Sequence, residues 1–91
     1  MSLKEKAQRQ IEEMKDQIEV LEAKFDSSKA DAKAEYMEKL AELKAKKAEL
    51  QEKYDELSHA AEDKWEGAKH IFSSAGDSFK EGFSKLSKLF D

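Results

Sequence analysis

The sequence predicts an all-α protein built from long amphipathic helices. Strong helix formers (alanine, glutamate, lysine, leucine and arginine) supply 51 of the 91 residues. Proline is absent, so no residue type forces a helix to break. Apolar residues recur every three or four positions, which is the α-helical repeat. We expect a single helical domain over residues 1–91, in which the helices form a coiled coil or a helical hairpin.

One apolar stripe runs almost the whole length of the chain. It holds 18 of the 23 large apolar residues in an arc about 100° wide on a helical wheel, the usual width of a buried helix face. Heptads alternate with eleven-residue steps, so the stripe should stay nearly straight. Because loops have no reason to preserve helical phase, the unbroken stripe favours long helices over short ones. The stripe consists of positions 3, 7, 11, 14, 18, 21, 25, 28, 32, 36, 40, 43, 47, 50, 54, 57, 61, 65, 68, 72, 75, 79, 83, 86 and 90.

The first part of the stripe, in residues 1–57, is mainly aliphatic and resembles a coiled-coil segment. Leucine, isoleucine and alanine dominate it, and charged residues fill the opposite face. We expect this part to mediate self-association or binding to another helical protein. The residues predicted to do so are Ile11, Ile18, Leu21, Phe25, Tyr36, Leu43, Leu50, Tyr54 and Leu57.

The last part of the stripe, in residues 62–91, is aromatic. Its flanks are rich in serine and glycine, with Lys69, Lys80, Lys85 and Lys88 present. Bulky aromatics beside a small, weakly charged face are typical of helices that lie on a lipid surface. They are equally suited to packing a protein core. The residues predicted to contact a partner or lipid are Trp65, Phe72, Phe79, Phe83, Leu86 and Phe90.

Three places could interrupt the helices. Residues 26–28 precede a capping-box match that begins at Ser28, and residues 58–61 offer a weaker helix start. Breaks there would give helices of roughly 25, 30 and 30 residues, the plan of a compact three-helix bundle. This bundle is the alternative fold. Residues 73–77 are the poorest helical stretch and are a third candidate for a turn.

Charge and residue types exclude several classes of function. The net charge is −4, and neither half has the cationic excess that neutralises phosphates, so we expect no nucleic-acid binding. Cysteine is absent, and the two histidines, His59 and His70, would lie roughly 16 Å apart on one helix, so we expect no metal and no cofactor. No nucleophile has an adjacent base, which predicts a chain that is not an enzyme.

The same features predict a cellular location. Residues 1–6 lack the apolar region of a secretory signal, and no run approaches the length of a membrane span. We therefore expect a cytoplasmic protein, peripheral to a membrane if the aromatic segment binds lipid.

Several segments resemble a family of small bacterial coiled-coil stress-response proteins described as apolipoprotein-like. The most specific are Asp-Ala-Lys-Ala-Glu-Tyr at residues 31–36 and Glu-Asp-Lys-Trp-Glu at residues 62–66, with its single tryptophan. Between them stand Leu-Ala-Glu-Leu-Lys-Ala-Lys at 40–46, Leu-Gln-Glu-Lys at 50–53 and Leu57. The resemblance covers roughly residues 11–83. It implies a helical, non-catalytic cytoplasmic protein and offers no catalytic residue.

One position departs from that family. Its members tend to place serine or glycine just before the tryptophan segment, which suggests a turn. Here residues 59–62 read His-Ala-Ala-Glu, so the resemblance leaves the turn in doubt.

Three hypotheses for function follow. The first is a stress-associated structural or interaction protein that acts through the stripe. The second is a lipid-surface binder that uses the aromatic segment. The third is a chaperone-like protectant, which would become helical only on a client or on drying.

Overall fold

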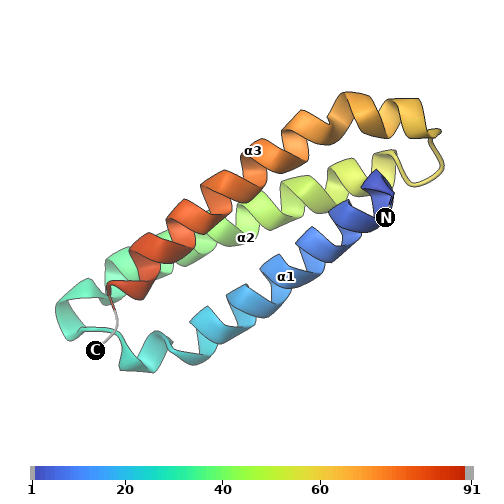
Figure 1. Cartoon of the computed structure of the whole chain (residues 1–91). Helices are drawn as coiled ribbons and strands as arrows, with labels where there is room; N and C mark the ends of the chain where they lie inside the picture. Colours follow the sequence, from blue (N-terminus) through green and yellow to red (C-terminus); the bar gives the residue numbers. More distant parts are fainter. Residues whose placement is uncertain (1, 90–91) are drawn as a thin grey trace.

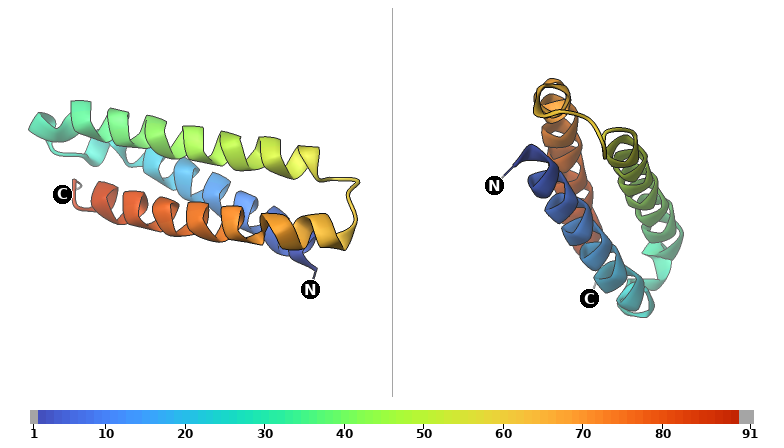
Figure 2. Two further views of the ribbon diagram at one scale, coloured as in Figure 1. Left: turned by 90° about the horizontal axis from the view of Figure 1, so that it is seen from above. Right: turned by 90° about the vertical axis from the view of Figure 1, so that its right-hand side faces the viewer.

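The computed structural model describes residues 2–89 and contains three α-helices that pack side by side (Figure 1). The helices are α1 (Leu3–Ala23), α2 (Lys33–Glu56) and α3 (Glu62–Ser87). Two short 3₁₀ helices, η1 (Phe25–Ser27) and η2 (Ala30–Ala32), lie between α1 and α2. Each α-helix contacts both of the others, and α2 runs antiparallel to α1 and α3 (Figure 2).

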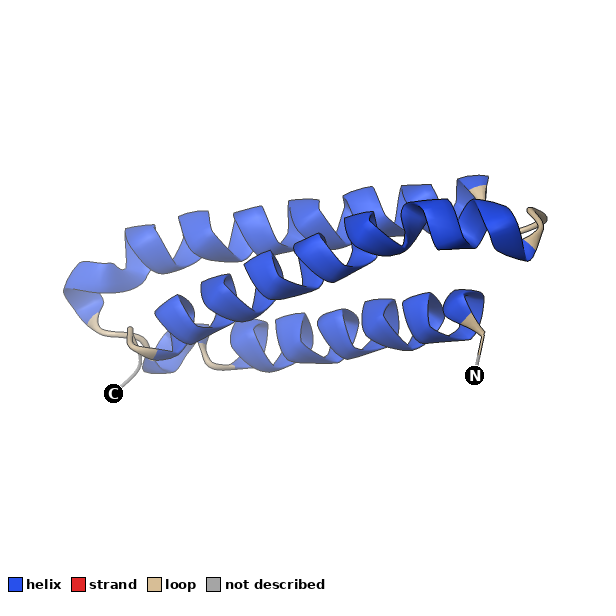
Figure 3. Cartoon of the chain, turned by 45° about the horizontal axis from the view of Figure 1, so that its top comes forward, coloured by secondary structure: helices blue, strands red, loops and turns tan. Residues whose placement is uncertain are grey.

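The all-α prediction is confirmed, and the alternative fold describes the arrangement better than the preferred one. The described residues form an elongated three-helix bundle of 48 × 19 × 18 Å, rather than a single hairpin (Figure 3). The helices break close to the two predicted places. We call residues 24–32 the first turn and residues 57–61 the second turn. The third candidate, residues 73–77, lies inside α3, where the helix continues without interruption.

The helices are therefore shorter than the unbroken phase of the stripe predicted. Both turns lie within the stripe, and the stripe keeps its spacing through them. Every buried residue of the described chain lies at a stripe position, so the stripe forms the core. The buried set is Ala7, Ile11, Met14, Ile18, Leu21, Ser28, Ala32, Tyr36, Leu40, Leu43, Leu50, Trp65, Ala68, Phe72, Ala75, Phe79 and Leu86.

Helix capping differs among the three helices. At the start of α1, the Ser2 hydroxyl accepts a hydrogen bond from the Glu5 amide at 3.2 Å, and the Glu5 carboxylate accepts one from the Ser2 amide at 3.5 Å. This reciprocal capping box satisfies two backbone donors. The N-cap residues of α2 and α3 are Ala32 and Ala61, and neither has a side chain that can cap. Two of the three helix starts therefore lack a capping side chain, although each carries acidic charge in its first turn.

The capping box predicted at Ser28 does not form. Helix α2 begins five residues later, at Lys33, and the Ser28 hydroxyl instead donates to the Phe25 carbonyl oxygen at 2.6 Å. Ser28 is only 5% exposed. Its hydroxyl fits there because this bond satisfies it within the turn.

Candidate interaction surface

The aliphatic residues predicted to mediate self-association lie inside the bundle. Six of the nine are buried: Ile11, Ile18, Leu21, Tyr36, Leu43 and Leu50. The other three are partly buried and pack against the same core: Phe25, Tyr54 and Leu57. The structure thus brings the predicted residues together, but against each other. In the closed bundle they do not form an exposed surface for a partner.

The aromatic residues predicted to contact a partner or lipid also lie inside the bundle. Trp65, Phe72, Phe79 and Leu86 are buried, and Phe83 is partly buried against the core. Phe90 lies outside the described residues. The first part of the stripe and the aromatic part therefore cover one another. Any use of either part by an outside partner requires the helices to separate.

The bundle end at the first turn is tightly packed. The Tyr36 hydroxyl donates a hydrogen bond to the Leu21 carbonyl oxygen near the end of α1. The Tyr36 ring stands 5.7 Å from the Phe25 ring, measured between centroids. Burial raises the pKa of the Tyr36 phenol above its ordinary value, which favours the neutral donor that this bond requires.

Lysine and backbone groups close the same end. The Lys33 ammonium donates to the Phe25 carbonyl oxygen at 3.1 Å and lies 4.7 Å from the centre of the Phe25 ring. The Lys29 amide donates to the Leu89 carbonyl oxygen at 3.0 Å, which ties the first turn to the chain just after α3. Side chains and backbone from all three helical regions meet here.

The opposite end of the bundle is organised around Trp65. Its indole ring is 2% exposed and lies 5.5 Å from the Tyr54 ring and 5.8 Å from the Phe72 ring, between centroids. Within the described residues, the indole Nε1 atom is buried and has no hydrogen-bond partner. A buried donor left without an acceptor costs about 1–3 kcal/mol. The closed state is therefore less favourable at Trp65 than ring packing alone would suggest.

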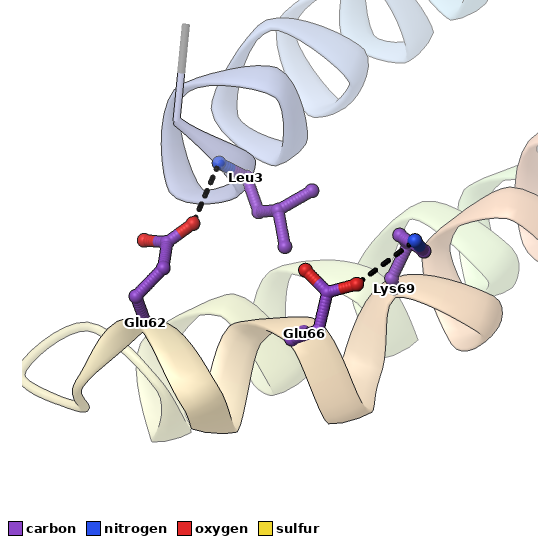
Figure 4. Close-up of polar contacts among 4 residues, drawn as sticks. All are labelled: Leu3, Glu62, Glu66 and Lys69. Atoms are coloured by element: carbon purple, nitrogen blue, oxygen red, sulfur yellow. Dashed lines mark hydrogen bonds and ion pairs between the residues drawn. The ribbon is translucent and has the colours of Figure 1, made fainter.

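Polar contacts from the start of α1 reach over this end. The Lys4 ammonium donates to the Ser58 carbonyl oxygen at 2.7 Å, in a partly buried position. The Leu3 amide donates to a Glu62 carboxylate oxygen at 3.5 Å, beside an exposed ion pair of 2.9 Å between Glu66 and Lys69 (Figure 4). These contacts are few and mostly exposed, so each contributes little.

A groove of about 450 Å³ lies between α1 and α3. Lys6, Arg9 and Lys80 bring positive charge to its lining, and Glu13 and Asp77 bring negative charge. Gln10 crosses it, since its side-chain amide donates to the Phe72 carbonyl oxygen at 2.8 Å. The mixed charge does not select a ligand of one sign.

Sequence reasoning missed Gln10 and two close contacts of α3. A Cβ atom added at Gly76 would lie 2.9 Å from the Gln10 side chain, and one added at Gly82 would lie 2.7 Å from Leu43. These glycines allow α3 to approach its neighbours. Their signal was present as glycine inside a helical pattern, but which glycine faces another helix depends on the packing.

Large apolar residues on the outside are scattered. Val20, Met37 and Ile71 are the exposed ones among the described residues, and each belongs to a different helix. Single exposed apolar residues of this kind are normal on a protein surface.

None of the described helices is long and apolar enough to cross a membrane. In residues 2–89, no three side chains of the usual acidic, histidine or cysteine type gather where they could hold a metal ion. Comparisons with family models, curated proteins and solved structures gave no match to this chain. The resemblance to the coiled-coil stress-response proteins thus depends on the quoted segments alone.

Proposed function

We propose that this chain is a non-enzymatic helical interaction protein that acts through its apolar stripe once the bundle opens. In the closed bundle the stripe is the core, and in an open form it becomes the binding surface. The favoured partner is a second copy or another amphipathic helix, because such a helix can replace the contacts that opening removes. An association with stress follows from the resemblance and stays a prediction.

One observation carries this proposal. All buried residues of the described chain belong to a stripe that continues in phase through both turns. A bundle alone needs each helix to have an apolar face, but it does not need the faces of successive helices to be in register across a turn. A form with fewer turns does need this register. The sequence therefore suits an open state as well as the closed one.

A lipid surface is the second candidate, favoured by Trp65. Its indole N–H lacks a partner in the closed bundle, and tryptophan is common where one side of a ring is apolar and its N–H meets water or headgroups. The outer face of α3 combines serine and lysine with acidic residues. Opening would let the aromatic residues of α3 enter lipid while the Trp65 N–H finds an acceptor.

Trp65 also determines how the proposal can be tested. Because Trp65 is already buried, a blue shift of its emission on adding vesicles would not distinguish lipid from the closed core. Quenching by brominated acyl chains does distinguish them, since it requires contact with lipid. We would measure quenching with phosphatidylcholine vesicles and with vesicles containing phosphatidylglycerol, and measure mass by sedimentation over a range of concentrations.

The proposal expects mass to rise with protein concentration, and the lipid candidate expects Trp65 to be quenched. The matched variant for the lipid arm is Phe83→Ser, because Phe83 is only partly buried and its loss should leave the bundle folded. A chain that stays monomeric at every concentration, and that no vesicle quenches, would refute the proposal. Helicity that appears only with a client or on drying would also refute it and favour the protectant role.

A further inference from the structure

We infer that the second turn is a hinge through which two copies of this chain exchange α3. In the exchanged dimer, α2 and α3 fuse into one helix over residues 33–87, and each α3 packs against α1 and α2 of the other copy. This inference rests on the proposed function, for which it names the partner and the element exchanged.

At the second turn the backbone leaves the helical region at Ala61, which is extended. Leu57 has φ −97° and ψ 2°, and Ala61 has φ −71° and ψ 163°. The φ value of Ala61 is nearly that of a helix, so a rotation of ψ would bring this residue into the helical region. In the described chain no residue has a positive φ, and the turn contains neither glycine nor proline. Fusion therefore requires ψ of Ala61 to change, but no glycine, proline or positive φ in the turn opposes it.

Local signals for a break are weak at this turn. Ala61 stands at the N-cap of α3 with the same extended backbone as Ser2 at the N-cap of α1, φ −72° and ψ 162°, but has no side chain that can accept a hydrogen bond. Alanine is the strongest helix former and a poor N-cap. Fusing the helices would instead satisfy the orphaned amides at the start of α3 with carbonyl groups of the turn.

The stripe spacing across the turn would keep the apolar residues of a fused helix on one face. Tyr54, Leu57, Ala61 and Trp65 are separated by three, four and four residues. In a continuous helix they share one face, because these steps follow the helical repeat. The face that covers α1 within one copy therefore continues directly into the face that carries Trp65. A fused helix can thus complete two bundles that lie end to end, at a length of about 80 Å.

The exchange restores the apolar contacts that it breaks, whereas the bond from Lys4 to the Ser58 carbonyl depends on the turn itself. Trp65, Phe72, Phe79 and Leu86 would meet the same α1 and α2 residues in the partner copy as in the closed chain. Exchange of an identical element is for this reason a low-cost route to a dimer. The first turn is a poor hinge by comparison, since its Ser28 is buried and its Lys29 amide is bonded to Leu89.

Complementation between two damaged chains tests the exchange. Leu21→Asp destroys the α1 part of the core, and Phe79→Asp destroys the α3 part, so each variant alone should lose its helical signal. Mixed in equal amounts, they can build one intact bundle from α1 and α2 of the Phe79→Asp chain and α3 of the Leu21→Asp chain. The mixture should regain about half of the helical signal of the unaltered chain, because one of its two bundles is intact.

A block at the hinge provides the matched control. Ala61→Pro suits the φ of −71° in the turn, where none of the described backbone hydrogen bonds uses the Ala61 amide, but it disrupts a fused helix. Ala61→Asp is a second block. Its carboxylate can cap α3 only when the turn is formed, so it stabilises the turn relative to the fused helix. Placed in both damaged chains, either block should abolish the recovery. Each block alone should leave the otherwise unaltered chain folded as a monomer.

Two results would overturn the inference. One is a mixture that regains no helicity, and the other is a recovery that both blocks leave unchanged. If recovery fails while the unaltered chain still gains mass with concentration or is quenched by vesicles, only the exchange is wrong and the proposed function stands. If mass and quenching also fail to change, both are wrong.

Discussion

The two turns have the same stripe spacing but opposite surroundings. Phe25, Ser28, Ala32 and Tyr36 in and after the first turn repeat the three, four and four steps found around the second turn. In the first turn Ser28 is buried and the backbone is bonded to residues of other elements. In the second turn the residues are exposed or partly exposed. Equal sequence patterns thus lead to one turn that places residues in the core and one turn whose residues stay accessible and which the bond from Lys4 to the Ser58 carbonyl holds to α1.

Two tyrosines 18 residues apart provide the largest expected contrast. Tyr36 is buried beside the first turn, and Tyr54 is partly buried beside the second. Tyr36→Ala should lower the free energy of unfolding by about 3–5 kcal/mol, since it leaves a cavity and removes the bond to Leu21. Tyr54→Ala should cost at most about 2 kcal/mol, because its ring buries less area.

Urea unfolding followed by circular dichroism measures both values. The slope of the unfolding free energy against urea concentration should match that of the unaltered chain, which would show that each variant still unfolds in one step. Equal losses for the two tyrosines would contradict the contrast between the turns.

Two alanines that begin helices provide a contrast of intermediate size. Ala61→Ser should stabilise the bundle by about 1 kcal/mol, because its extended backbone lets a hydroxyl cap α3 as Ser2 caps α1. Ala32→Ser should bring no gain, since Ala32 has φ −106° and ψ −2°, outside the extended conformation of a cap, and its side chain is buried. Thermal unfolding of the two variants side by side is the measurement. A gain at residue 32 that equals the gain at residue 61 would show that the two helix starts do not differ.

Glycines near the two ends of α3 provide the smallest contrast. A Cβ atom at Gly67, near the second turn, would meet nothing within 4 Å, whereas one at Gly82 would lie 2.7 Å from Leu43. Gly67→Ala should therefore stabilise the bundle by about 0.5–1 kcal/mol through helix propensity. Gly82→Ala should gain nothing or destabilise, because Leu43 is buried and has little room to move. Chemical denaturation resolves the two, and a clear gain at Gly82 would argue against close packing there.

Much of the core could be predicted from the sequence. Every residue that the described structure buries, including the polar Ser28, lies in the stripe predicted from the sequence. Helical periodicity carries this information because a side chain on the apolar face of a helix is buried against whatever covers that face. The identity of the cover does not matter to the pattern. For this reason the stripe identified the candidate site residues but assigned them to outside partners, whereas the structure packs them on one another.

The sequence by itself determined helical character, the buried face and the absence of any forced break. Local signals marked residues 26–28 and 58–61 as places for a turn, but only the tertiary structure decided that the chain folds back there and not at residues 73–77, and what covers the stripe. Ala32 and Ala61 begin helices without a capping side chain, so neither break has a strong local cause. The breaks arise because folding back buries Tyr36, Trp65 and the other stripe residues together, a gain summed over distant contacts. The sequence pattern around either turn does not show this gain, because the contacts join residues that are far apart in the sequence.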